Sequence, residues 1–183
     1  MKATGIVRRI DDLGRVVIPK EIRRTMRIRE GDPLEIYTDR EGEVIFKKYS
    51  PIGELHGFAA QYADTLSRTC GLSIIITDRD AVIACAGVPK KDYAEKRLSA
   101  DLEKITDNRS FYQYRQGERK LSVIDDAGAH YISSAMPIIS EGDITGCVVS
   151  VLAENESGAE RNVELEEKLI RTAASFLGRQ LES

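Results

Sequence analysis

Four cationic side chains repeat at helical spacing near the start of the chain. Lys20, Arg23, Arg24 and Arg27 stand at positions i, i+3, i+4 and i+7. They share one face of a helix, because each residue turns the helix by about 100°. Like charges at i,i+4 destabilise an isolated helix by roughly 0.2–0.5 kcal/mol per pair, so an external anion should compensate them. A polyanion suits this stripe, because lysine and arginine on phosphates release condensed counterions. A solvated basic face is the alternative interpretation.

The residues before the stripe predict where its helix begins. Val16 to Ile18 are β-branched and predict a short strand. Pro19 should end that strand, because proline has no N–H for a sheet ladder but suits the first position of a helix. We therefore expect a helix from Pro19 to Arg27. A helix this short is marginal alone, so it needs contacts from elsewhere.

Charge is unevenly distributed along the 183 residues. The formal net charge of the whole chain is −3, but residues 1–29 hold nine Lys and Arg against three Asp and Glu. Residues 51–183 hold 15 against 21. A basic segment on an acidic body indicates a dedicated anionic partner for the N-terminus. No apolar run is long enough to span a membrane, and no signal-peptide core is present, so we expect a cytoplasmic protein without membrane contact.

The sequence contains little that predicts catalysis, a cofactor or a metal site. It has three widely spaced cysteines without a CxxC pair, Cys70, Cys85 and Cys147, and we expect buried thiols rather than disulfides or zinc ligands. Asp125 and Asp126 lie near His130, but their spacing matches no metal or triad signature. A polar turn is the preferred interpretation there. Since no P-loop, GxGxxG or GxSxG motif appears, we expect no enzyme and no cofactor.

Residues 1–50 are predicted to form one small ββαββ domain. The predicted elements are strands at 5–10 and 16–18, the helix at 19–27, and a hairpin of strands at 34–38 and 43–48. So short a segment buries too little apolar surface to be stable alone, and it contains no cysteine to staple it. We therefore expect an intertwined dimer. A helix-turn-helix is disfavoured, because one helix stands between strand pairs.

A linker at 51–54 and a second domain at 55–183 follow. The predicted elements are a helix at 54–70, strands at 72–77 and 81–86, a helical segment at 90–105, a polar irregular segment at 106–120, strands at 121–124, 131–139 and 144–152, and a closing helix at 163–181. This order predicts an α+β layer with an antiparallel sheet. The two terminal helices should pack together, and their apolar stripes could form a second dimer interface, giving a homotetramer.

Several stretches of the N-terminal domain closely resemble the AbrB family of bacterial transition-state regulators. They are Thr4 to Arg8, Leu13 to Arg24, Leu34 to Tyr37 and Lys47 to Tyr49. The second domain looks like a GAF sensor domain, and the combination resembles a sporulation regulator of spore-forming bacilli. This resemblance implies a swapped-hairpin dimer that binds double-stranded DNA, associates with the nucleoid and regulates transcription as an activator or repressor.

The resemblance also implies which side chains contact DNA. In that family the arginines equivalent to Arg8, Arg15, Arg23 and Arg24 carry DNA contact. Adding the cationic stripe gives the expected DNA-binding set Arg8, Arg15, Lys20, Arg23, Arg24 and Arg27. Family members tend to prefer deformable, AT-rich DNA without a strict consensus, which fits phosphate contacts and shape readout.

Two alternatives remain open. Antitoxins reuse the same DNA-binding domain and bind a partner toxin, but they typically end in a polar tail rather than in a folded domain of this size. The second domain is either a small-molecule sensor or a purely structural oligomerisation module. Residues that could cover a ligand pocket, with arginine for an anion and tyrosine for stacking, are Tyr93, Arg97, Arg109, Tyr112 and Tyr114.

Residues 1–50 should fold only as a dimer, because the segment has a small core and no staple. The melting temperature of the isolated fragment should then fall on dilution, since the stability of an obligate dimer depends on protomer concentration. Circular dichroism melts across about two decades of concentration measure this dependence. A melting temperature that does not change with concentration would contradict the prediction.

Overall fold

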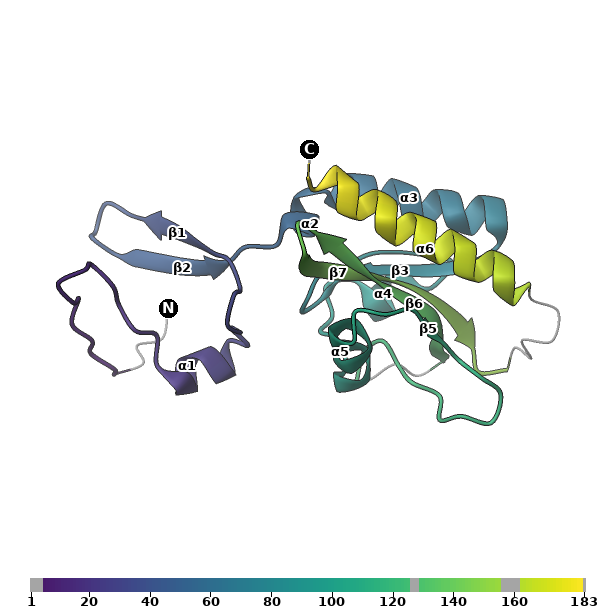
Figure 1. Ribbon diagram of the computed structural model, residues 1–183, viewed down its shortest axis with the longest axis horizontal. Helices are drawn as coiled ribbons and strands as arrows, with labels where there is room; N and C mark the ends of the chain where they lie inside the picture. The colour runs from purple at the N-terminus through teal and green to yellow at the C-terminus, as the bar shows by residue number, and fades with distance from the viewer. Residues whose placement is uncertain (1–4, 126–128, 156–161, 183) are drawn as a thin grey trace. The chain divides into compact units, whose positions relative to one another are not determined.

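The computed structural model describes residues 5–125, 129–155 and 162–182, and the chain divides into two compact units (Figure 1). Unit 1 is Met1–Tyr49 and unit 2 is Ser50–Ser183. Two residues used in the sequence analysis, Thr4 and Asp126, lie outside the described residues.

Unit 1 contains one helix and one hairpin. Its elements are α1 (Lys20–Thr25), β1 (Leu34–Thr38) and β2 (Val44–Lys48). The two strands are antiparallel, with Leu34 opposite Lys48 and Thr38 opposite Val44. A carboxylate oxygen of Asp39 accepts the backbone N–H groups of Glu41 and Glu43, at 3.0 and 2.8 Å, and so holds the turn. The predicted hairpin is confirmed.

The two strands predicted before α1 are wrong for the isolated chain. Residues 5–10 and 15–19 carry no strand assignment, and a turn separates them. A strand requires a neighbouring segment that pairs with its backbone N–H and C=O groups, and neither stretch belongs to a sheet of the described residues. Most of their apolar side chains are exposed, above all Val7, at 88%, whereas Ile18 is half-buried and Pro19 is buried.

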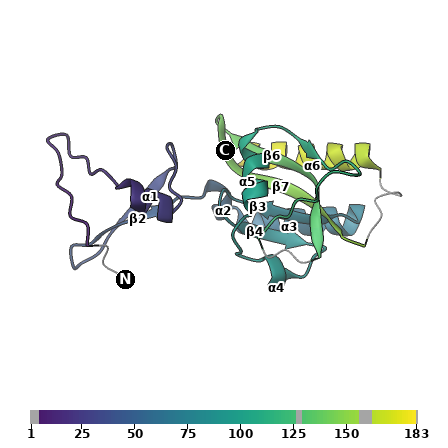
Figure 2. The same ribbon diagram turned by 90° about the horizontal axis from the view of Figure 1, so that it is seen from below.

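Unit 2 is built on a five-stranded antiparallel sheet with the order β4-β3-β7-β6-β5. Helices α3 and α6 cover one face of the sheet, while α4 and α5 lie on the other (Figures 1 and 2). The α+β domain with packed terminal helices, expected from the order of its predicted elements, is thereby confirmed. The elements are α2 (Pro51–Glu54), α3 (His56–Cys70), β3 (Ser73–Thr77), β4 (Val82–Ala86), α4 (Lys90–Tyr93), α5 (Ala100–Asp107), β5 (Tyr112–Gln113), β6 (His130–Ser140), β7 (Asp143–Ala153) and α6 (Val163–Gln180).

Each face of this sheet carries its own hydrophobic core. Alternate side chains of a strand point to opposite faces, and strand β3 shows both. Ile74 and Ile76 pack in the core that includes α3 and α6, whereas Ile75 packs in the core that includes α5. Burial on both faces explains why this strand reads as an almost unbroken apolar run.

The predicted linker and the predicted middle helix both differ from the structure. Residues 51–54 form α2, which is capped by the Ser50 hydroxyl and buries Ile52 completely. The segment 90–105 splits into α4 and α5, because the chain between them pairs with β4 instead. Val82 donates its N–H to the Lys96 carbonyl at 2.9 Å, and Glu95 has a φ of 60°.

Two further expectations need correction. Residues 121–124 form no strand, although Val123 and Ile124 are buried in the hydrophobic core that includes α5. Among the cysteines, Cys85 and Cys147 are buried as predicted, and burial raises the pKa of the Cys147 thiol to about 12. Cys70 is exposed instead. It occupies the last residue of α3, one turn beyond Leu66, where the buried stripe of that helix ends.

Gly178 lets the last turns of α6 approach the sheet closely. A Cβ at this position would lie 2.3 Å from the carbonyl oxygen of Ile139 in β6. The atom it would meet is backbone, so a side chain cannot be accommodated without moving the helix or the strand. Gly178 therefore sets the spacing between the terminal helix and its sheet.

Gly178→Ala should destabilise unit 2 by about 1–3 kcal/mol, because overpacking forces backbone shifts. Gly57→Ala is the matched control, since it makes the same change in α3 at a position that faces open space. That control should be neutral or stabilising by up to about 1 kcal/mol, because alanine is the better helix former. Urea unfolding followed by helical circular dichroism compares the two. Equal midpoints for both variants would refute the close-approach explanation.

Candidate nucleic-acid interface

Helix α1 presents its cationic side chains to solvent because it buries none of its residues. Pro19 precedes the helix with extended geometry, and Lys20 is its first residue. Lys20, Arg23 and Arg24 are all exposed. Three of the four residues of the predicted stripe therefore lie on this short helix, free of core packing.

Arg27 departs from the predicted stripe, because the helix ends at Thr25. Arg27 has a φ of 52°, in the left-handed region. Its N–H bonds to the Arg24 carbonyl at 3.3 Å, and the N–H of Ile28 bonds to the Arg23 carbonyl at 2.8 Å. These two bonds form a Schellman motif, which satisfies the last carbonyls of a helix. Arg27 is half-buried at the helix end, and its inclusion in a helical stripe is wrong.

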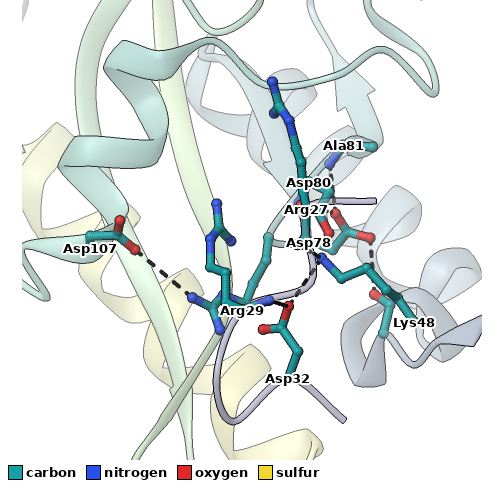
Figure 3. A network of polar contacts seen from close by, with 10 residues as sticks. Arg27, Arg29, Asp32, Lys48, Asp78, Asp80, Ala81 and Asp107 are labelled. Atoms are coloured by element: carbon teal, nitrogen blue, oxygen red, sulfur yellow. Dashed lines mark hydrogen bonds and ion pairs between the residues drawn. The ribbon is translucent and has the colours of Figure 1, made fainter. Parts of the chain in front are cut away.

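A polar network connects the end of α1 to the hairpin (Figure 3). The Lys48 ammonium lies 3.3 Å from a carboxylate oxygen of Asp32, whose side chain is only 2% exposed. Lys48 also donates to the Arg27 carbonyl at 2.9 Å, and the Arg29 N–H donates to the Asp32 carboxylate at 2.8 Å. Removing Lys48 would be costly, because it would leave the buried Asp32 carboxylate without its counter-charge. Lys48 and Asp32 therefore hold the C-terminal end of α1 against β2.

A second acidic residue organises the loop before α1. One carboxylate oxygen of Asp11 accepts the backbone N–H groups of Leu13 and Arg15, at 3.0 and 2.7 Å. Its other oxygen accepts the Arg15 Nε–H at 2.8 Å. The chain turns through Gly14, which has a φ of 76°. The backbone N–H of Arg15, followed by its side chain, holds the pKa of the Asp11 carboxyl below its ordinary value of 3.8.

Five of the six predicted DNA-binding residues are exposed, the exception being half-buried Arg27; the five are Arg8, Arg15, Lys20, Arg23 and Arg24. The structural roles of Asp11, Asp32 and Lys48 were missed by sequence reasoning. For Asp11 a signal exists, since aspartate three residues before glycine is typical of a turn closed by its own carboxylate. For the contact between Asp32 and Lys48 the sequence contains no such signal, because the two residues are distant in sequence.

The residues predicted to cover a ligand in unit 2 do not converge. Tyr93 is buried, and its hydroxyl lies 3.1 Å from Nδ1 of His130, the first residue of β6. Arg109 donates to the carbonyl of Gly142, beyond the last residue of β6. Strand β6 has 11 residues and rises about 3.3 Å per residue, so these two contacts lie near opposite ends of a long strand.

The remaining three candidate ligand residues also have structural explanations. The Tyr114 ring packs edge-on against Tyr131, with centroids 4.9 Å apart. Tyr112 packs against the hydrophobic core that includes α5, and Arg97 is exposed and forms an isolated backbone bridge with Ala81. Tyr93 and Arg109 therefore do not share one small pocket, whereas Tyr93 and Tyr112 pack in the same core.

Neither a metal centre nor a membrane span is found in the parts of the chain that the structure describes. Those parts contain no group of three or more His, Cys, Asp or Glu side chains arranged to hold a metal ion. Asp125 is exposed, and His130 contacts Tyr93. None of the described helices is both long and apolar enough to cross a membrane.

Two family models match consecutive parts of this chain. Residues 54–182 match the model described as "Stage V sporulation protein T C-terminal, transcription factor". Residues 7–53 match the model described as "Antidote-toxin recognition MazE, bacterial antitoxin".

Curated relatives from Bacillus subtilis (strain 168) extend these matches. The chain is 53% identical to stage V sporulation protein T over 184 aligned residues, which cover 100% of this chain and 99% of that protein. It is 65% identical to the transition state regulatory protein AbrB over 51 residues, which cover 28% of this chain and 52% of that protein.

A solved structure shares the fold at low identity. A methyl-accepting chemotaxis protein, residues 122 to 287, is 15% identical, with a TM-score of 0.53 and coverage of 69% of this chain and 88% of that chain. That coverage exceeds the length of unit 1 and must lie mostly in unit 2. The likeness concerns the fold alone.

The Asp11 carboxyl should titrate below 3.8, because its charged form is the hydrogen-bonded one. Arg15→Ala should raise this pKa only part of the way, since the backbone N–H of residue 15 remains a donor. The loop contacts are then fully formed above the ordinary pKa and are lost as the pH falls through the lowered one. Carboxyl ¹³C NMR titrations of both proteins measure the two values. An Asp11 pKa at or above 3.8 in the unmutated chain would disprove the bonding described here.

Proposed function

This chain belongs to the stage V sporulation protein T family of transcription factors, and we propose that unit 1 binds double-stranded DNA while unit 2 assembles the protein into a tetramer. The observation that carries the proposal is the exposed cationic face of α1. This helix buries no residue and presents Lys20, Arg23 and Arg24 to solvent. The chain includes 51 residues that are 65% identical to the transition state regulatory protein AbrB.

Phosphate contact and DNA shape supply the proposed recognition. Arginine and lysine neutralise phosphates regardless of sequence, while deformable AT-rich DNA adapts to the protein surface. The proposed contact residues are Arg8, Arg15, Lys20, Arg23 and Arg24. Arg27 contributes through the backbone, since its carbonyl accepts the Lys48 ammonium and so fixes the end of α1. The protein would act at promoters in the nucleoid, as an activator or a repressor, without catalysis.

A second copy of the chain would complete unit 1. Val7, Ile10 and Val17 are exposed on segments that lack a ladder within one chain. Ile36, Val44 and Phe46 are exposed on the hairpin. So much exposed apolar surface on so small a unit marks an interface. A swapped-hairpin dimer would pair the extended segments and bury these side chains.

The terminal helices of unit 2 supply the proposed tetramer interface. The Phe176 ring on α6 lies 5.7 Å from Phe58 and 5.5 Å from Tyr62, both on α3, and Phe176 remains exposed. Aromatic side chains of this kind are enriched in protein interfaces. Two DNA-binding dimers in one assembly would gain avidity on a single duplex. Tyr93 and Arg109 contact opposite ends of β6, so a single small ligand would not meet both of them.

The antitoxin alternative is weaker. The MazE model covers residues 7–53 alone, and AbrB matches 51 residues, or 28%, of the chain. The relative that covers the full length is a sporulation protein. A toxin partner would leave unit 2 without a role, whereas a DNA-binding regulator uses both units.

The double variant Arg23→Ala, Arg24→Ala should weaken DNA binding across sequences. Each lost phosphate contact should reduce the log–log salt slope by about 0.9. Fluorescence anisotropy on an AT-rich duplex at several salt concentrations measures affinity and slope together. Arg68→Ala in unit 2 is the control, because Arg68 is an exposed arginine that pairs with Asp64 on α3. Wild-type affinity in the folded double variant would exclude α1 as the DNA-binding element.

A further inference from the structure

Two aspartates stand in the most basic part of the chain. Asp11 and Asp12 lie between Arg9 and Arg15, in the loop that precedes α1. A negative charge on a surface that binds a polyanion repels phosphate and should lower affinity. These two residues therefore need either a structural explanation or a functional one.

The two aspartates differ in their contacts. The Asp11 carboxylate makes three hydrogen bonds, to the backbone N–H groups of Leu13 and Arg15 and to Nε of Arg15. The backbone closes the same loop, since Asp11 N–H donates to the Arg15 carbonyl at 3.1 Å and Gly14 N–H to the Asp11 carbonyl at 3.0 Å. Asp12 is exposed and has no hydrogen bond or ion pair with the described residues.

The contact with Asp11 uses one edge of the Arg15 guanidinium and leaves the rest accessible. A guanidinium has five N–H donors in a rigid plane, and Asp11 takes the one on Nε. The Arg15 side chain is still 69% exposed. The donors on the two terminal nitrogens can therefore meet a phosphate or a base edge while Asp11 holds the plane of the group.

Resting on the DNA-binding function proposed above, we propose that Asp11 is a positioning residue for DNA recognition. It orders the 11–15 loop and holds the Arg15 guanidinium in its binding orientation before DNA arrives. Ordering a long side chain in advance avoids an entropic cost of association that corresponds to about 2- to 13-fold in affinity. The lowered pKa of Asp11 agrees with this role, because it keeps the carboxylate charged wherever DNA is bound.

A positioning role and simple electrostatics predict opposite changes in DNA affinity for the same substitution. Asp11→Asn removes one negative charge from the DNA-facing segment, so electrostatics alone predicts tighter binding. Loss of the Arg15 contact predicts weaker binding. Asp12→Asn removes an identical charge one residue away without breaking any described contact, and it is therefore the matched control.

The experiment measures binding of the full-length protein to an AT-rich duplex by fluorescence anisotropy at low and moderate salt. Asp12→Asn should bind as tightly as the wild type or more tightly. Asp11→Asn should bind about 2- to 13-fold more weakly than the wild type. In an Arg15→Ala background the same Asp11→Asn change should no longer weaken binding, because its effect passes through Arg15. NMR of the Arg15 Nε–H, which should exchange faster in Asp11→Asn, confirms that the contact is lost in a folded protein.

Each alternative outcome is distinguishable. Tighter binding by both Asp11→Asn and Asp12→Asn would overturn the positioning role and assign Asp11 a purely repulsive effect. An equal loss with and without Arg15 would also overturn it, because Asp11 would then act on the loop alone. Failure of the wild-type protein to bind DNA would instead overturn the proposed function, on which this role depends.

Discussion

Hydrogen bonds from backbone N–H groups to aspartate carboxylates hold unit 1 in its conformation. Pro19 is the only buried residue among the described residues of this unit, so core packing contributes little to its loops. Asp11, Asp32 and Asp39 each accept backbone N–H groups at a turn. Such bonds to a charged group are stronger than neutral ones. The acidic residues of a basic segment are thus used internally, while most of its cationic side chains face solvent.

The same carboxylates decide how the cationic groups are presented. The Lys48 ammonium pairs with Asp32 and donates to the Arg27 carbonyl, so it is less available to an external anion than the exposed cations are. Asp11 holds Arg15 by Nε and leaves its terminal nitrogens outward. Arg23 and Arg24 need no such support, because the helix itself orients them. The unit therefore combines a rigid helical pair of arginines with an arginine that is oriented by a loop.

Unit 2 follows the opposite principle, since its order comes from packing. Both faces of its sheet are covered, and glycines allow closer contact than any other residue. Besides Gly178 on Ile139, a Cβ at Gly146 in β7 would lie 2.0 Å from the Thr77 carbonyl oxygen of β3. A domain packed this closely would suit the assembly role proposed for it. It also explains why residues that look suited to ligand binding, such as Tyr93, are occupied by internal contacts.

Local pattern in the sequence determined the elements whose partners are close along the chain. The hairpins β1–β2 and β3–β4, the long strands β6 and β7, and helix α6 were all predicted from periodicity and turn residues, and so were the exposed arginines of α1. Tertiary structure decided what depends on distant partners. Residues 5–10 and 16–18 have strand-like composition but belong to no sheet within one chain. Arg27 leaves the helix and takes part in a Schellman motif. Tyr93 and Arg109 contact opposite ends of β6. The physical reason is that periodicity reports which face of an element is apolar, whereas hydrogen-bond partners such as Lys48 for Asp32 are chosen only when segments far apart in sequence meet.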